Sequence, residues 1–378
     1  MKVFTRAILP LGFKASGVAS GIKKSGKLDL AIFYSDAPAK AACLFTANKI
    51  IAAPLKLDKI FLKRNKTFRA IIVNSGNANC YTGPAGLKDA EEVAKCASLI
   101  LDTKKEGILV NSTGIIGKRL PIGRVKRSLL ALCRGLSRSG IDKAKNAILT
   151  TDTFAKEITA KFPISGKTVT VCAVAKGAGM VSPEMATMLV FIFTDADITA
   201  GALKRALRLS TAASFNCISI DGCMSTNDSI MALANAAAKN RKIDKGGDFN
   251  SFVKALKFLC LRLAKMVVKD GEGATKFIQI TVDKAKNAIE AKKAALAVAN
   301  SNLFKAAMFG ENPNFGRIVA AIGASGIDVE EDKLKIKVSS VKGKEINVYA
   351  AINKGDARST VYTSDLTPEY VKINAEYN

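Results

Sequence analysis

Alternating strand and helix patterns over 378 residues predict an α/β or α+β protein in which helices cover mixed or mostly antiparallel sheets. Hydrophobic residues make up 48 % of the chain, so it can bury a substantial core. At roughly 150 residues per domain, the length corresponds to two domains or to one large domain with an appendage. The two halves differ little in composition, so the sequence marks no sharp boundary between domains.

Short runs rich in β-branched or apolar residues predict the strands, because they are bounded by Gly, Asn, Asp or Lys. The segment KTVTVCAV alternates in polarity, which suits a sheet with one face on the core. The predicted strands are Leu28–Tyr34, Arg69–Val73, Lys167–Val174, Met188–Phe193, Ser229–Ala234, Phe277–Val282, Leu334–Val338 and Ile346–Ala351.

Longer segments with apolar residues at helical spacing predict the helices. The predicted helix Thr199–Ser214 follows Asp197 and has Thr199 as its expected N-cap. The segment KIDKGGD, Lys242–Asp248, predicts a surface turn before the predicted helix Ser251–Val268. The predicted helices are Leu87–Leu101, Thr199–Ser214, Ser251–Val268 and Ala285–Asn300.

The chain contains no histidine, and this absence excludes several classes of enzyme mechanism. A Ser-His-Asp triad, a Cys-His pair, an H-E-x-x-H zinc site and a histidine proton shuttle all need an imidazole. Any catalytic base must therefore be another group.

The formal net charge is +26, from 58 Lys+Arg against 32 Asp+Glu. A basic surface is the usual signature of phosphate binding, so a nucleic-acid-binding protein is one hypothesis. The lysines are spread over the whole chain, however, and aromatic residues make up only 6 % of it. This distribution favours a solvated lysine-rich surface and no nucleic-acid partner.

The eight cysteines contain no C-x-x-C pair, and a zinc site without histidine would need four scattered thiolates. Several cysteines lie in apolar runs, where a reduced cysteine acts as a small hydrophobic residue. The sequence also shows no signal peptide and no apolar stretch of about 18 residues that would span a membrane. We therefore expect a cytoplasmic protein without a membrane partner.

The most informative segment runs from 175 to 196, where a Gly-rich turn leads to Thr187 at the start of an apolar run. Most threonines in this setting are ordinary strand residues. The functional alternative is a threonine that becomes a chain N-terminus by self-cleavage. Its own α-amine would then be the base for its hydroxyl, and this chemistry needs no histidine.

Eight segments in a fixed order resemble the ornithine acetyltransferase family, whose members are also called glutamate N-acetyltransferases. The resemblance spans nearly the whole chain and includes the segment KGAGMVSPEMATMLVFIFTDA around Thr187. The other segments are Gly12–Gly21 (GFKASGVASG), Val73–Cys80 (VNSGNANC), Asn111–Gly117 (NSTGIIG), Ile148–Thr153 (ILTTDT), Gly271–Lys276 (GEGATK), Gly310–Ile318 (GENPNFGRI) and Ile373–Tyr377 (INAEY).

The resemblance implies an α/β sandwich of the self-processing N-terminal-nucleophile type, with stacked mixed sheets flanked by helices. It implies cleavage between Ala186 and Thr187 into an α chain, 1–186, and a β chain, 187–378. A smaller C-terminal subregion would begin near residue 285. Two α and two β chains would assemble into a heterotetramer.

The resemblance also implies an acyltransferase of arginine biosynthesis. Thr187 would take acetyl from N2-acetylornithine, release ornithine and pass the acetyl group to glutamate in a ping-pong reaction. Thr113 and Gly114, in a Gly-flanked loop, match the oxyanion hole. No cofactor or metal is implied, and use of acetyl-CoA as a second acetyl donor stays open.

Thr150, Lys176, Glu272 and Asn374, together with Thr187, match the substrate-binding positions of the family. A lysine ammonium can hold a substrate carboxylate, and a glutamate carboxylate can hold the ornithine ammonium.

The chain departs from the family pattern at three places. Ser182-Pro183-Glu184 replaces the usual His-Pro-Asn, and Phe315 replaces a Trp. A Thr or Ser five residues after Asn374 would fall one position beyond Asn378, so we expect this ligand to be missing. The alternative function on the same scaffold is an N-terminal-Thr amidohydrolase or aminopeptidase, in which water resolves the acyl-enzyme.

Overall fold

Two sheets organise the chain, one in each of two structural units. The computed structural model describes residues 1–182 and 188–376. Among these, the first unit comprises 1–177, 188–211 and 225–263, and the second comprises 178–182, 212–224 and 264–376.

The described residues of the first unit form a nine-stranded mixed sheet in the order β1-β6-β7-β8-β9-β3-β4-β5, with β2 paired to β3. Strand β8 pairs in parallel with β9, and β4 pairs in parallel with β5, whereas the other neighbours are antiparallel. The strands are β1 Lys2–Phe4, β2 Phe13–Val18, β3 Leu30–Phe45, β4 Phe68–Asn77, β5 Ile108–Ile115, β6 Lys156–Ile164, β7 Lys167–Lys176, β8 Leu189–Thr194 and β9 Ser229–Ala234.

Strand β3 joins the two halves of this sheet. Its residues 30–34 pair with β2 and β4, its residues 40–45 pair with β9, and the register shifts between Tyr34 and Ala39. The halves face each other, because the Phe33 ring lies 5.2 Å from that of Phe191 and 5.0 Å from that of Phe193, centroid to centroid. The buried aromatic and aliphatic side chains between them form the main core of the unit.

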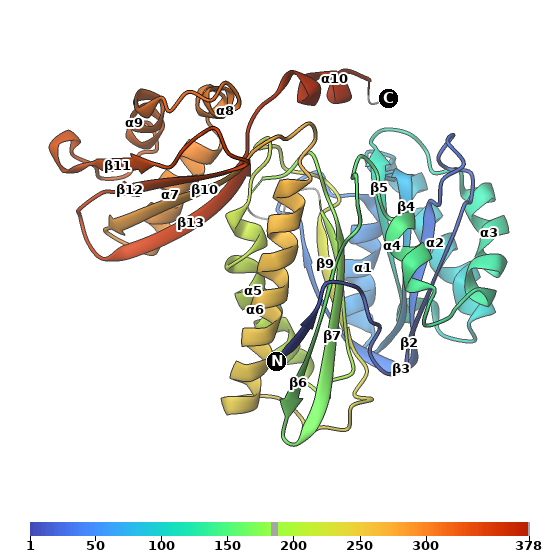
Figure 1. Ribbon diagram of the computed structural model, residues 1–378. Helices are drawn as coiled ribbons and strands as arrows, with labels where there is room; N and C mark the ends of the chain where they lie inside the picture. The colour runs from blue at the N-terminus through green and yellow to red at the C-terminus, as the bar shows by residue number, and fades with distance from the viewer. Residues whose placement is uncertain (183–187, 377–378) are drawn as a thin grey trace. The chain divides into compact units, whose positions relative to one another are not determined.

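Helices cover both outer faces of this sandwich (Figure 1). Helices α1 and α4 pack on the half that contains β2 and β5. Helix α6 packs on the other half, where Phe252 contacts Phe162 of β6. The helices are α1 Ala53–Arg64, α2 Gly83–Ile100, α3 Ile122–Arg134, α4 Ile141–Ala147, α5 Ala200–Ala212 and α6 Gly246–Lys269, whose last residues belong to the second unit.

The second unit has a four-stranded sheet, within residues 264–376, in the order β11-β12-β10-β13. Helix α7 packs on β10 and β13, and a separate apolar core lies between them. Side-chain caps at Asn287, Ser301 and Asn314 start α7, α8 and α9, each accepting a backbone N–H three residues on. The elements are β10 Phe277–Ala285, α7 Ala288–Ala299, α8 Asn302–Phe309, α9 Phe315–Gly323, β11 Lys335–Val338, β12 Glu345–Ala351, β13 Ala357–Ser364 and α10 Pro368–Glu376.

The structure confirms the predicted class, with mixed sheets flanked by helices, and all the predicted strands are present. The Thr199 cap is also confirmed, since Thr199 Oγ1 accepts the N–H of Ala202 at 3.1 Å. Two local predictions are wrong. The predicted turn is wrong only for 246–248, because helix α6 begins at Gly246, and Thr113 and Gly114 lie in strand β5 rather than in a loop.

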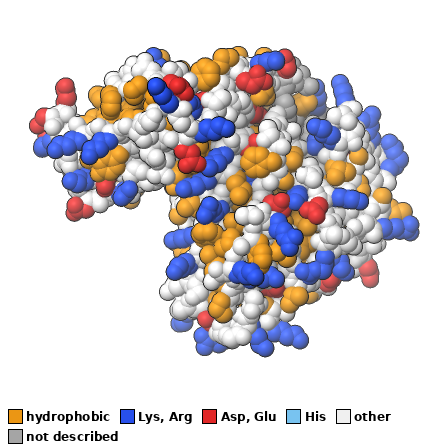
Figure 2. All heavy atoms as spheres, viewed as in Figure 1, with side chains coloured by type: hydrophobic (Ala, Val, Ile, Leu, Met, Phe, Trp, Pro, Cys, Tyr) orange, Lys and Arg blue, Asp and Glu red, His pale blue; other side chains and the backbone are white. Residues whose placement is uncertain are grey.

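The surface agrees with the interpretation of the charge as a property spread over the chain. Figure 2 shows lysine and arginine side chains scattered over the visible face, without one dominant basic patch. All eight cysteines are free thiols. None of the helices in residues 1–182 and 188–376 combines the length and apolarity needed to cross a bilayer.

Candidate active site

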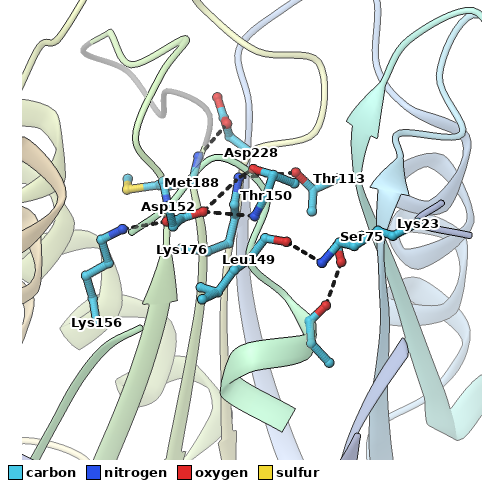
Figure 3. A network of polar contacts seen from close by, with 12 residues as sticks. Lys23, Ser75, Thr113, Leu149, Thr150, Asp152, Lys156, Lys176, Met188 and Asp228 are labelled. Carbon is cyan, nitrogen blue, oxygen red and sulfur yellow. Dashed lines mark hydrogen bonds and ion pairs between the residues drawn. The ribbon is translucent and has the colours of Figure 1, made fainter. Parts of the chain in front are cut away.

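Lys176, the last residue of β7, connects the predicted site residues of the first unit (Figure 3). Its Nζ donates a hydrogen bond of 2.6 Å to Thr150 Oγ1 and a longer one of 3.4 Å to Thr113 Oγ1. The Lys176 side chain is only 3 % exposed. The structure therefore brings a buried cation, a candidate oxyanion donor and a candidate substrate ligand to one place.

Asp152 holds this group together at the end of β7. Its carboxylate lies 2.5 Å from Lys156 Nζ and 3.8 Å from Lys176 Nζ, and it accepts the N–H of Gly177 at 2.6 Å. Burial alone would raise the pKa of Asp152, but Lys176 and Lys156 outweigh it and hold that pKa well below its usual value. The carboxylate is thus ionised. It also accepts the N–H of Thr150 at 3.1 Å, so it holds the loop of Thr150 to the end of β7.

Lys23 supports the same loop from the other side. Its Nζ donates to the carbonyl oxygens of Leu149, at 2.7 Å, and Leu28, at 2.9 Å. Burial lowers the pKa of Lys23 to about 8, and the nearby Lys176 ammonium contributes to this lowering. Ser75 Oγ donates to the carbonyl of Ala147 at 2.6 Å, so the chain leading into Thr150 is held at several points.

Thr113 and Gly114 lie at the C-terminal end of β5, paired in parallel with β4. Gly114 has a φ of +132°, and a Cβ there would lie 2.4 Å from the carbonyl carbon of Gly76. Only glycine allows this close approach of the two strands. The Thr113 hydroxyl and the Gly114 N–H, adjacent at the end of this strand, are groups that can donate to a developing oxyanion.

Asp228 precedes β9 and contacts the start of the strand that follows Thr187. Its Oδ1 accepts the N–H of Met188 at 2.9 Å, as Figure 3 shows. Within residues 1–182 and 188–376, its Oδ2 is buried without a hydrogen-bond partner. Burial raises the pKa of Asp228 well above its usual range, which favours a neutral carboxylic acid beside the residue after Thr187.

The second unit holds the other two predicted ligands in contact with each other. Asn374 Nδ2, on α10, donates to Glu272 Oε2 at 2.8 Å. The predicted cleavage site, Ala186 and Thr187, lies outside the residues that the structure describes.

A sequence model of the ArgJ family matches residues 14–378. The chain belongs to the ArgJ family.

Individual relatives agree with this assignment over nearly their full lengths. "Arginine biosynthesis bifunctional protein ArgJ" of Caldanaerobacter subterraneus is 43 % identical, over 98 % of this chain and 97 % of the relative. The protein of the same name in Geobacter sulfurreducens is 44 % identical, over 97 % and 98 %. The "Glutamate N-acetyltransferase" of Methanocaldococcus jannaschii is 40 % identical, over 97 % of each chain. The predicted family and the acyltransferase class are therefore confirmed.

For this ArgJ-family chain, the sequence predicted the residues around Lys176 but not those that hold it. Asp152 stands inside the quoted ILTTDT segment, and its acidic character between two threonines was the available signal. Lys156 and Asp228 carry no motif of their own: burial gives Lys156 its role beside Asp152, four positions before it, and Asp228 acts through Met188, 40 positions before it.

Proposed function

We propose that the enzyme transfers acetyl from N2-acetylornithine to glutamate through an acetyl-Thr187 intermediate in a ping-pong reaction. The observation that carries the proposal is the contact of Lys176 Nζ with both Thr150 and Thr113. A cation that binds the carboxylate of an amino acid then lies next to a donor for the oxyanion of the acyl group.

Maturation comes first in this proposal. The Thr187 hydroxyl attacks the carbonyl carbon of Ala186, and the peptide bond is replaced by an ester. Water then hydrolyses the ester, which gives an α chain, 1–186, and a β chain, 187–378, with a new α-amine on Thr187. This amine acts as the base for the Thr187 hydroxyl, so the reaction needs no histidine.

Acetyl transfer then occurs in two half-reactions. The Thr187 hydroxyl attacks the acetyl carbonyl of N2-acetylornithine, its proton passes through the α-amine to the leaving nitrogen, and ornithine departs. The α-amino group of glutamate attacks the acetyl ester, and N-acetylglutamate leaves. Thr113 and the Gly114 N–H stabilise both tetrahedral intermediates.

Substrate recognition uses complementary charges. Lys176 and Thr150 bind the substrate carboxylate, whereas Glu272, supported by Asn374, binds the ammonium group of the ornithine moiety. The proposal further includes an assembly of two α and two β chains, a C-terminal subregion from about residue 285, and a cytoplasmic location. Use of acetyl-CoA as a second donor is separate from this mechanism.

A denaturing mass spectrum of the purified protein tests the maturation step. We expect two fragments that meet between Ala186 and Thr187 in the wild type, and one uncut, inactive chain in Thr187→Ala. Thr187→Ser keeps a hydroxyl and is expected to cleave. An uncut wild-type chain with full acetyltransferase activity would refute the proposal.

Incubation with N2-acetylornithine, with and without glutamate, tests the transfer step. We expect stoichiometric acetylation of Thr187 without glutamate and continuous N-acetylglutamate formation with it. Continuous acetate release without glutamate would instead identify an amidohydrolase.

A further inference from the structure

We propose that residues 178–181 are a positioning element for the Glu272 carboxylate, and that Asp221 holds this element in place. The inference rests on the proposed function, in which Glu272 binds the ammonium group of the acyl donor. After cleavage, residues 178–181 would belong to the α chain, whereas Asp221 and Glu272 would belong to the β chain. The α chain would then position a β-chain carboxylate that selects the acyl donor.

The contact between this element and Glu272 is close and has both backbone and side-chain parts. The Glu272 N–H donates to the carbonyl oxygen of Ala178 at 2.8 Å. The Glu272 carboxylate packs directly on Gly179, where a Cβ would lie 2.3 Å from Oε2 and 2.6 Å from Oε1. With Asn374 bonded to Oε2 on the other side, the carboxylate is held between the element and α10.

Gly179 is required here for space rather than for its backbone conformation. Its φ lies outside the left-handed region, so an L-residue could adopt the same backbone angle. The atoms that a Cβ would meet belong to the end of the Glu272 side chain, which can rotate away. A methyl group at this position would therefore move the carboxylate while leaving the fold intact.

Asp221 fixes the next two residues of the element. Its carboxylate accepts the N–H groups of Met180 at 2.5 Å and Val181 at 2.8 Å. Met180 has a φ of +57°, a left-handed conformation that is unfavourable for a non-glycine residue. These two charge-assisted bonds offset that cost. The carboxylate also accepts the hydroxyl of Tyr370, on the same helix as Asn374, at 3.3 Å.

The test compares two acyl donors that differ only in the ammonium group. N2-acetylornithine carries it, and N-acetylnorvaline has the same carbon chain without it. A misplaced Glu272 carboxylate weakens binding of the first donor and leaves the second unaffected, whereas general damage to the site lowers both. The glutamate half-reaction, measured from the isolated acetyl-enzyme, gives a further internal reference.

For Gly179→Ala, we expect kcat/KM for N2-acetylornithine to fall about 10- to 100-fold, because the charge-assisted contact between Glu272 and the donor's ammonium group is lost. We expect kcat/KM for N-acetylnorvaline and for glutamate to stay within about twofold. Gly323→Ala is the matched control, because Gly323 lies in α9 with open space around its Cβ position. It should leave all three values unchanged.

Asp221→Asn keeps the shape of the side chain but removes its charge, and we expect the same donor-selective loss at a smaller size. Because residues 180–181 precede the cleavage site, the rates are taken per cleaved enzyme, quantified by mass spectrometry. Equal losses for both donors in Gly179→Ala, or no loss for either, would overturn the inference while the proposed function stands. A wild-type enzyme that transfers no acetyl group from N2-acetylornithine would refute both.

Discussion

The Lys176 ammonium nitrogen and the Thr150 hydroxyl oxygen lie 2.6 Å apart, although the two residues are separated by 26 positions in the chain. The bond joins the end of β7 to the loop after α4. The Lys176 ammonium is buried and also contacts Thr113 and Asp152, so the Thr150 bond is one of several that set its direction. Three predictions concern this network, and a fourth concerns Lys305 in the second unit.

Thr150→Val removes the hydroxyl that accepts from Lys176 and keeps the shape of the side chain. We expect kcat/KM to fall about 10-fold for both substrates, the worth of a hydrogen bond to a charged group, because both present a carboxylate to Lys176. Steady-state kinetics of the cleaved enzyme measure the change. Thr151→Val, at the next position, is the control, and an equal loss in that variant would contradict the assignment.

Thr113→Val tests the oxyanion hole. Loss of one such donor lowers kcat by about 10²–10³ while substrate binding is largely preserved, because the bond forms in the transition state. Single-turnover acetylation of Thr187 separates this effect from binding. A change confined to KM would assign Thr113 to substrate binding instead.

Asp152→Asn removes the carboxylate between two buried lysines and should lower the free energy of unfolding by about 3–5 kcal/mol. Since the folded-state pKa of Asp152 is lowered, its contribution is present above the unfolded-state pKa of about 3.9 and is lost as the pH falls below that value. Urea unfolding of both proteins at pH 7 and pH 3 measures the difference. We expect the gap between them to narrow at pH 3, and a constant gap would argue against an ionised Asp152.

Lys305 makes the stability of the second unit depend on pH in the alkaline range. Burial lowers the pKa of Lys305 to about 8, although its Nζ donates to Ile220 O and to Thr363 Oγ1. Between pH 8 and 10.5 the unfolded chain binds this proton and the folded chain does not, so the residue raises the free energy of unfolding as the pH rises. From pH 8 to 10.5, the free energy of unfolding of the wild type should rise by up to about 3 kcal/mol relative to that of Lys305→Met. Parallel stability profiles of the two proteins would contradict the shifted pKa.

Much of the fold could be predicted because its strands are apolar runs. LVFIFT and SIMALA are buried throughout, as expected for a parallel pair inside a sheet. Strand β5 escaped prediction because its sequence, ILVNSTGI, ends in polar residues that a turn would also contain. In the structure these residues are buried and bonded, since Ser112 Oγ donates to Asn74 Oδ1 at 2.6 Å and Asn111 Nδ2 donates to Ser229 Oγ.

Only those site residues whose roles belong to a recognisable motif could be predicted from the sequence. Thr113, Thr150 and Lys176 stand in segments with a family pattern, and the structure brings them together. Asp152 and Asp221 act by accepting N–H groups from residues 25 and 40 or more positions away. Such long-range partners leave no periodicity in the sequence, so only the folded chain reveals them.

The strand order of the first unit has a consequence for the two chains that the proposed self-cleavage would produce. Strands β8 and β9, which would belong to the C-terminal product, lie between β7 and β3, which would both belong to the N-terminal product. Each of the two junctions, β7 with β8 and β9 with β3, is a continuous ladder of backbone hydrogen bonds, so the two product chains would share one interleaved sheet. They should elute together from any native column and come apart only when the sheet itself is denatured.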